Sequence, residues 1–189
     1  MRTANARSVR RPRHPLATAL AGALALLALA AAAPAQTPEE RLAALGITLP
    51  EPAAPVANYV RAVTTGNLVF LAGHVPRDAA GEVVRGKVGS VLDVEQGRAA
   101  ARLTAIGLLA SLKAEIGSLD RVTRIVKVTG MVNSTPGFVE QPAVVNGCSD
   151  LLVEVFGERG RHARSAVGMA SLPVGAAVEI EMIVEIAPP

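Results

Sequence analysis

Apolar and polar residues alternate most regularly near the end of the chain. Across residues 178–186 every second position is apolar, while Glu179, Glu181 and Glu185 share the opposite side with Ile183. A period of two predicts a β-strand with one buried face. The last strand of the fold is therefore expected here, with carboxylates on the side that faces away from the core.

A second apolar strand is predicted from Ala163 onwards, and Arg164 is a lone charged residue at its start. The sequence Leu-Pro-Val-Gly at 172–175 predicts a turn between the two strands. Arg164 and Glu179 then each lie near the start of a strand. Such a pair suits a structural role, or a site that holds and hydrolyses a small carboxylate-bearing molecule.

The periodicities typical of strands and of helices also locate the earlier elements of the fold. Residues 67–73 predict a strand after a Thr-Thr-Gly turn, and residues 82–85 predict a short strand that forms a hairpin with it. A capping box of Asp93 and Gln96 begins a helix that Gly117 ends. The apolar positions at helical spacing in this helix are Ala99, Leu103, Ile106 and Ala110.

Three further segments complete the predicted order. Residues 39–45 predict a short helix, residues 121–132 a strand and residues 138–156 a second long helix. Gly107 lies inside the first long helix and indicates close packing, because glycine costs about 1 kcal/mol relative to alanine there. The alternate positions expected to share one face of the 121–132 strand are Val122, Arg124, Val126 and Val128.

The order β-β-α-β-α-β-β predicts an α+β fold in which two helices cover one face of a mixed sheet. Apolar residues such as Ile183 also fall on the second face, which helices on one side leave uncovered. Packing between copies of the chain would bury that face, so a homo-oligomer is expected.

Residues 1–35 predict a signal peptide. Five arginines and no acidic residue precede an uncharged Ala/Leu run at 16–33, and Ala-Pro-Ala at 33–35 fits the pattern that signal peptidase cleaves. The protein is therefore expected to be exported, periplasmic or secreted, with cleavage near Ala35. An uncleaved membrane anchor is the alternative, and the Arg-Arg pair at 10–11 leaves both Sec and twin-arginine export open.

Loss of this segment changes the charge. Five of the 19 Lys and Arg lie in it and none of the 16 Asp and Glu, so 14 basic and 16 acidic residues remain, a net charge of −2 instead of +3. With no Trp and one Tyr, a nucleic-acid surface is not expected. Three His and one Cys, widely spaced, predict neither a metal site nor a cofactor, and Cys148 is expected to be a small packed residue.

The residues from about Tyr59 onwards share motifs with a known family. The chain resembles the RidA/YjgF family of reactive-intermediate deaminases, which implies a chorismate-mutase-like α+β fold and a homotrimer with clefts between subunits. The chain then divides into a signal peptide (1–35), a lead-in segment (36–58) and a RidA-like domain (59–189). The matching segments are Asn58-Tyr59-Val60, Ala72-Gly73-His74-Val75-Pro76, Asn146, Ala163-Arg164-Ser165-Ala166-Val167, Leu172-Pro173 and Val178-Glu179-Ile180-Glu181.

The resemblance implies a reaction, the hydrolysis of enamine or imine intermediates such as 2-aminoacrylate to a 2-keto acid and ammonia. Arg164 would bind the substrate carboxylate through its planar guanidinium group, and Glu179 would orient or deprotonate the attacking water. The substrate-binding residues that the resemblance implies are Tyr59, Gly73, His74, Asn146 and Ala166.

The chain departs from the family pattern around this site. Ala72 and His74 replace the small polar residue and the glutamine that flank the glycine in typical active members, and Ala166 replaces a common cysteine. These changes alter the pocket but keep its arginine and its glutamate.

Each candidate residue also has a structural interpretation. Arg164 suits an ion pair across a subunit interface, and Glu179 suits a solvated strand face on which Glu181 is its rival for handling water. His74 suits a polar surface position at a strand end, and Asn146 suits the solvated side of a helix.

Three functional hypotheses remain at the sequence level. The first is an exported homotrimeric imine and enamine deaminase. The second is a non-catalytic module of the same fold that binds a small carboxylate metabolite through Arg164. The third is an RNA-directed nuclease, a label attached to some family members, against which the acidic charge balance argues. No stable membrane association is expected once the signal peptide is cleaved.

Overall fold

The structure is a computed structural model that describes residues 36–52, 54, 55 and 57–188, so the predicted signal peptide lies outside it. Short 3-10 helices at Leu119–Arg121, Gly157–Gly160 and Pro173–Gly175 connect the main elements. None of the described helices is long and apolar enough to cross a membrane. The main elements are α1 Pro38–Ala44, β1 Ala62–Thr65, β2 Leu68–His74, α2 Val94–Ile116, β3 Val122–Asn133, α3 Gln141–Phe156, β4 Ala163–Met169 and β5 Val178–Ile186.

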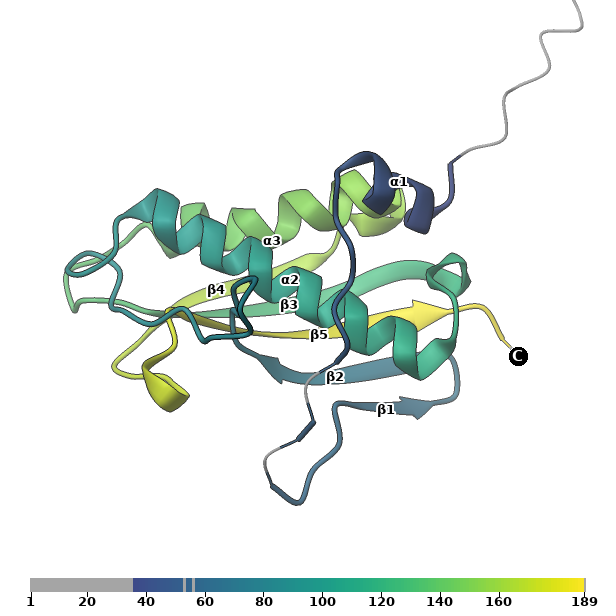
Figure 1. Cartoon of the computed structure of the whole chain (residues 1–189), viewed down its shortest axis with the longest axis horizontal. Helices are drawn as coiled ribbons and strands as arrows, with labels where there is room; N and C mark the ends of the chain where they lie inside the picture. Colours follow the sequence, from purple (N-terminus) through teal and green to yellow (C-terminus); the bar gives the residue numbers. More distant parts are fainter. Residues whose placement is uncertain (1–35, 53, 56, 189) are drawn as a thin grey trace, which may run out of the picture. The chain divides into compact units, whose positions relative to one another are not determined.

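The strands form one mixed sheet in the order β1-β2-β5-β3-β4. β3 and β4 are parallel, and the other neighbouring strands are antiparallel. The long helices α2 and α3 lie side by side on one face of the sheet (Figure 1). The α+β prediction with two helices on one face is confirmed, and β1 and β4 are the edge strands.

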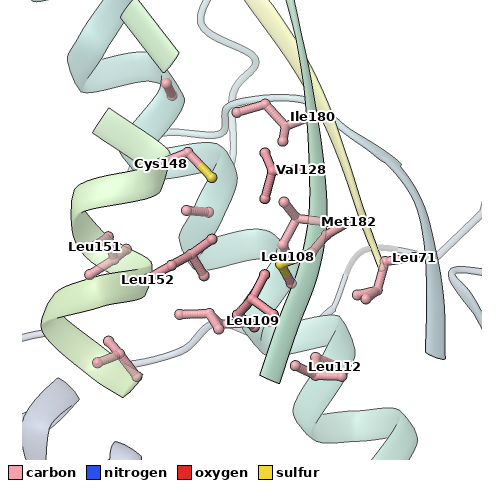
Figure 2. Packing of buried hydrophobic residues seen from close by; sticks show 14 of the residues in the cluster. Leu71, Leu108, Leu109, Leu112, Val128, Cys148, Leu151, Leu152, Ile180 and Met182 are labelled. Atoms are coloured by element: carbon pink, nitrogen blue, oxygen red, sulfur yellow. The ribbon is translucent and has the colours of Figure 1, made fainter. Parts of the chain in front are cut away.

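The core fills the space between this sheet and the two long helices. Leu108 and Leu112 of α2, together with Leu152 of α3, pack toward Val128 of β3 and Met182 of β5 (Figure 2). Burial of such side chains stabilises a fold by roughly 1.5–3 kcal/mol each. Cys148 belongs to the same cluster, as predicted, and burial raises the pKa of its thiol to about 12. A thiol with that pKa is inert as a nucleophile at neutral pH.

The alternation predicted for β5 is confirmed, because its apolar face is buried and Glu179, Glu181 and Glu185 lie on the other side. The face predicted for β3 is correct for Val122 and Val128, which are both buried, and wrong for Arg124. Register shifts against β5 interrupt the period of two on either side of Ile125, so Ile125 is buried whereas Arg124 is exposed. An extra residue in one strand moves the following side chains to the opposite face, and the sequence pattern does not reveal where this happens.

The face predicted for α2 is also wrong in its main positions. Ala99 is exposed and Leu103 is half-buried, whereas Ala101, Ala105 and Leu108 are fully buried. Alanine and leucine occur around most of this helix, so helical spacing by itself does not select the buried side. The predicted capping box and the end of the helix at Gly117 are both confirmed.

Two predicted boundaries need correction. β2 forms its hairpin with β1 rather than with residues 82–85, which make isolated bridges from Val83 and Arg85. The long helix expected from residue 138 begins at Gln141, with Pro142 in its first turn. Proline is tolerated there because the first N–H groups of a helix have no intrahelical partner.

Candidate functional site

Arg164 lies on the edge strand β4, on the same side of the sheet as the helices. It is paired in register with Val128, which is fully buried beneath α3. The guanidinium Nη1 of Arg164 donates to Asn146 Oδ1 at 2.9 Å and to Ser149 Oγ at 3.0 Å. Nη2 makes a longer contact of 3.5 Å with the carbonyl oxygen of Pro142. The predicted anchor and the predicted Asn146 are therefore brought together by packing of β4 against α3.

A histidine that the sequence motifs do not include completes this cluster. His162 Nε2 lies 3.0 Å from Ser149 Oγ, and His162 Nδ1 lies 2.7 Å from the carbonyl oxygen of Gly160. Burial lowers the pKa of His162, the bond to Gly160 opposes this, and the nearby Arg164 lowers it further. His162 is consequently neutral at pH 7, with its proton on Nδ1 and its Nε2 accepting from the Ser149 hydroxyl.

Glu179 lies on the opposite side of the sheet, against Gly73 of β2. A β-bulge places Ala72 and Gly73 between the paired positions Leu71 and His74, opposite the single residue Glu181 of β5. A Cβ atom at position 73 would collide with the Glu179 carboxylate. Glycine lets the Glu179 carboxylate lie here, whereas a larger residue would force this flexible side chain to move.

The surroundings of Glu179 favour its protonated form. Burial raises the pKa of the Glu179 carboxyl, and the neighbouring Glu181 carboxylate raises it further. A carboxylate with a raised pKa is a better proton acceptor from water than an ordinary carboxylate, and a larger share of it is protonated near neutral pH. Glu181 is more exposed than Glu179 and shares its face of β5.

A hollow of about 300 Å³ lies on this uncovered side of the sheet. Its lining combines apolar side chains, among them Val63 of β1 and Phe70 of β2, with Lys127, Thr129 and Glu181. Val63 is 53% exposed and Phe70 is 41% exposed. Tyr59, which is 49% exposed, immediately precedes Val60 at the rim of the hollow.

Arg164 and Glu179 therefore do not face each other within one chain. Arg164 reaches toward α3 on the helix side, whereas Glu179 projects from the uncovered side of β5. β3 also separates their strands. One copy of the chain cannot place both groups on one small molecule, so a site that uses both requires a second copy.

A family model described as "YjgF/chorismate mutase-like, putative endoribonuclease" matches residues 39–186. The chain belongs to the RidA/YjgF family. Among its relatives, Protein TCP17 of Trypanosoma cruzi is 49% identical over 143 residues, which are 75% of this chain and 89% of that protein. A 2-iminobutanoate/2-iminopropanoate deaminase of Dermatophagoides farinae is 31% identical over 142 residues, which are 74% and 94% of the two chains.

The same family relationship is found among solved structures. The crystal structure of Atu1372 from Agrobacterium tumefaciens, a protein of unknown function, superimposes with a TM-score of 0.73 at 47% identity. The match covers 79% of this chain and 92% of that one. The chorismate-mutase-like fold expected of a RidA/YjgF member is thereby confirmed.

Two of the predicted substrate-binding residues of this RidA/YjgF member, His74 and Ala166, point into the interior. The ring of His74 lies toward α2, where Nε2 is 2.7 Å from Ser111 Oγ and Nδ1 is 2.7 Å from the Ala72 carbonyl oxygen. Burial lowers the pKa of His74, which keeps its ring neutral. Ala166 packs against the core on the same side of β4 as Arg164. His74 is thus placed away from the face that carries Glu179.

Ser149, and through it His162, is hydrogen-bonded to Arg164, and the sequence motifs of the RidA/YjgF family included neither residue. Ser149 is three positions after Asn146 on α3, and His162 is two positions before Arg164, just before β4 begins at Ala163. These spacings put each residue on the same face as its partner. Such periodic reasoning, applied around the known motif positions, would have identified both.

Potential metal ligands are dispersed in this RidA/YjgF member. Within the part of the chain that the structure describes, no three His, Cys, Asp or Glu side chains gather closely enough to bind a metal ion. The polar groups assembled at Arg164 and Glu179 suit carboxylate binding and proton transfer.

Proposed function

We propose that the protein hydrolyses reactive enamine and imine intermediates of the 2-aminoacrylate type to a 2-keto acid and ammonia. The observation that carries this proposal is the placement of Glu179, a half-buried carboxyl group with a raised pKa, beside Gly73. Membership of the RidA/YjgF family and 31% identity to a 2-iminobutanoate/2-iminopropanoate deaminase support it.

The reaction needs an anchor for the substrate and a group that moves protons. Arg164 binds the carboxylate of the iminium form, CH3–C(=NH2⁺)–COO⁻, through charge-assisted hydrogen bonds. Glu179 takes a proton from water as the oxygen attacks the imine carbon, and returns it to the amino group of the resulting carbinolamine. The C–N bond then breaks as the hydroxyl proton of the carbinolamine passes to the departing ammonia, giving CH3–CO–COO⁻ and NH4⁺. Every atom of the substrate and of the one water is accounted for.

We also propose that the active unit is a homotrimer with its sites between subunits. Arg164 and Glu179 lie on opposite sides of the sheet in one chain, so a shared site joins Arg164 of one copy to Glu179 of its neighbour. The apolar side chains around the hollow on the uncovered face provide surface for that association.

The reaction can be tested with 2-iminobutanoate generated in situ. We expect the wild type to accelerate release of 2-ketobutyrate, and we expect Arg164→Ala and Glu179→Gln each to lower kcat/KM by at least about a hundredfold. Arg161→Ala is a matched control, because Arg161 is exposed and pairs with Glu158. No acceleration by wild type would refute the hydrolase.

Mixing the two inactive variants tests the shared site. Subunits that carry Arg164→Ala still supply Glu179, and subunits that carry Glu179→Gln still supply Arg164. After mild dissociation and reassembly, mixed trimers would regain part of the wild-type rate. If each variant and the mixture are equally inactive despite exchange of subunits, both groups act within one chain.

A non-catalytic carboxylate-binding module is the second candidate. It is favoured by His74 and Ala166, which turn toward the interior and leave fewer polar groups near Gly73 and Arg164. Saturable binding of 2-ketobutyrate that is lost in Arg164→Ala, without turnover by the wild type, would support this function instead.

A further inference from the structure

His162, Ser149 and Arg164 form a continuous chain of hydrogen bonds. The bond between His162 and the Gly160 carbonyl determines which group donates in each of the others. The carbonyl oxygen of Gly160 can only accept, so His162 donates to it from Nδ1 at 2.7 Å. His162 Nε2 is then an acceptor, and the Ser149 hydroxyl, 3.0 Å away, must donate to it. The lone pairs of Ser149 Oγ are left to accept from Arg164 Nη1 at 3.0 Å.

This arrangement uses one part of the Arg164 guanidinium group and leaves another part available. Both hydrogens of Nη1 are engaged, one by Ser149 and one by Asn146. Among the described residues, Arg164 Nε has no hydrogen-bond partner, and Nη2 has one long contact of 3.5 Å with Pro142. Nε and Nη2 form the edge of a guanidinium group that receives a carboxylate through two parallel hydrogen bonds.

We propose that Ser149 and His162 are positioning residues that hold the Nη1 corner of Arg164, so that its Nε–Nη2 edge is presented to a ligand carboxylate. The inference rests on the proposed function for the identity of the ligand. Without Ser149, Nη1 keeps Asn146 as its partner, but Asn146 is exposed on α3 and holds the arginine less firmly. The neutral state of His162 is part of the device, because a protonated imidazole beside Arg164 would add a second positive charge.

The first test measures ligand binding by calorimetry with 2-ketobutyrate as the probe, alongside KM and kcat with 2-iminobutanoate. For Ser149→Ala we expect Kd and KM to rise about 5- to 20-fold while kcat changes less than about twofold. Ser118→Ala is the serine control, because Ser118 caps the turn before β3. A Kd for Ser149→Ala within twofold of wild type would overturn the proposal.

Two substitutions of His162 test the roles of its two ring nitrogens separately. Glutamine places an amide oxygen near the position of Nε2 and can accept from Ser149, whereas asparagine reproduces only the Nδ1 side. We expect His162→Gln to retain most of the wild-type affinity and His162→Asn to weaken it as much as Ser149→Ala does. Equal affinities for the two variants would contradict the role given to Nε2.

A spectroscopic measurement tests the same His162–Ser149–Arg164 hydrogen bonds independently of activity. Long-range ¹H–¹⁵N NMR at pH 7 should find the His162 proton on Nδ1 and an unprotonated Nε2, whereas a proton on Nε2 would overturn the proposal. If the wild type binds 2-ketobutyrate but shows no turnover, the hydrolase is refuted while the Kd series still decides the positioning role. Absence of carboxylate binding by the wild type would overturn both.

Discussion

Gly73 and Glu179 are in close steric contact, because the Glu179 carboxylate occupies the volume that a side chain at position 73 would need. The obstacle is the end of a flexible glutamate rather than backbone. A substitution at position 73 is therefore expected to displace the acid while changing the fold little. A substitution at position 73 can therefore test the role of Glu179 in turnover separately from its effect on stability.

For Gly73→Ala we expect kcat to fall by at least about tenfold, whereas the free energy of unfolding changes by less than about 1 kcal/mol. Gly66→Ala should show the reverse. Gly66 has a positive φ of 58° and open space around it, so alanine there costs about 1–2 kcal/mol of stability and leaves turnover unchanged. Denaturant unfolding and keto-acid release measure the two effects, and unchanged kcat in Gly73→Ala would argue against Glu179 as the proton-transfer group.

The raised pKa of Glu179 predicts a pH-dependent stability difference. Because the folded state disfavours the ionised form, wild type loses stability as pH rises from about 4.5, the ordinary pKa, through the raised value. Glu179→Gln lacks this loss. At pH 7 we expect the variant to be more stable than wild type by less than about 1 kcal/mol, because solvent screens a half-buried group. At pH 4, where Glu179 is largely protonated in both states, we expect this advantage to be lost. A difference that stays constant with pH would contradict this origin.

At the scale of elements, the pairing of α2 with α3 depends on small residues at their contact. A Cβ at Gly147 of α3 would collide with the backbone carbonyl of Arg98 in α2. Ion pairs of 2.8 Å, Arg98–Asp150 and Arg102–Glu154, then join the exposed sides of the helices. Gly107 was expected to mark close packing as well, but the nearest contact for a Cβ there is the His74 ring at 3.7 Å.

The two helix glycines should consequently respond in opposite ways to alanine. Gly147→Ala is expected to lower the free energy of unfolding by about 1–3 kcal/mol, because the helices must move apart. Gly107→Ala should raise it by about 0.5–1 kcal/mol through helix propensity. Thermal or urea unfolding of the two variants measures the difference, and destabilisation by Gly107→Ala would indicate that the helix cannot accept even a methyl group at this position.

At the scale of the whole molecule, the uncovered face of the sheet is the surface that a trimer would bury. Phe70→Asp places a charge on that face, and we expect it to convert the trimer into monomer and to abolish turnover. Val91→Asp is the control, because Val91 is 72% exposed in the loop before α2. Sedimentation velocity at micromolar concentration measures both, and a wild type that sediments as a stable monomer would refute the trimer.

Residues 1–35 are proposed to direct export of the whole chain. Cleavage near Ala35 predicts that protein recovered from the native host begins at Gln36, just before the capping box of α1. N-terminal sequencing would detect this. A recovered chain that begins at Met1 or Arg2 would refute cleavage and favour the membrane anchor or no export.

Most of the fold follows from local patterns in the sequence. The alternation in β5 and the capping box of α2 depend on neighbours in the chain, so the class of fold was predictable, although β1 at Ala62–Thr65 was missed and residues 82–85 were wrongly predicted as a strand. The Arg164 and Glu179 positions were also found from the sequence, because a lone charge in an apolar strand and a row of acids are local features.

Tertiary structure decided which of these residues meet. The bulge at Gly73, the register shifts in β3 and the buried side of α2 each depend on contacts between distant segments. Packing of β4 against α3 brought Ser149 and His162 to Arg164, while the order of strands placed Glu179 on the opposite side. The sequence by itself identified Arg164 and Glu179 as separate candidate residues. Only the folded chain, through long-range packing, put them on opposite faces of one sheet.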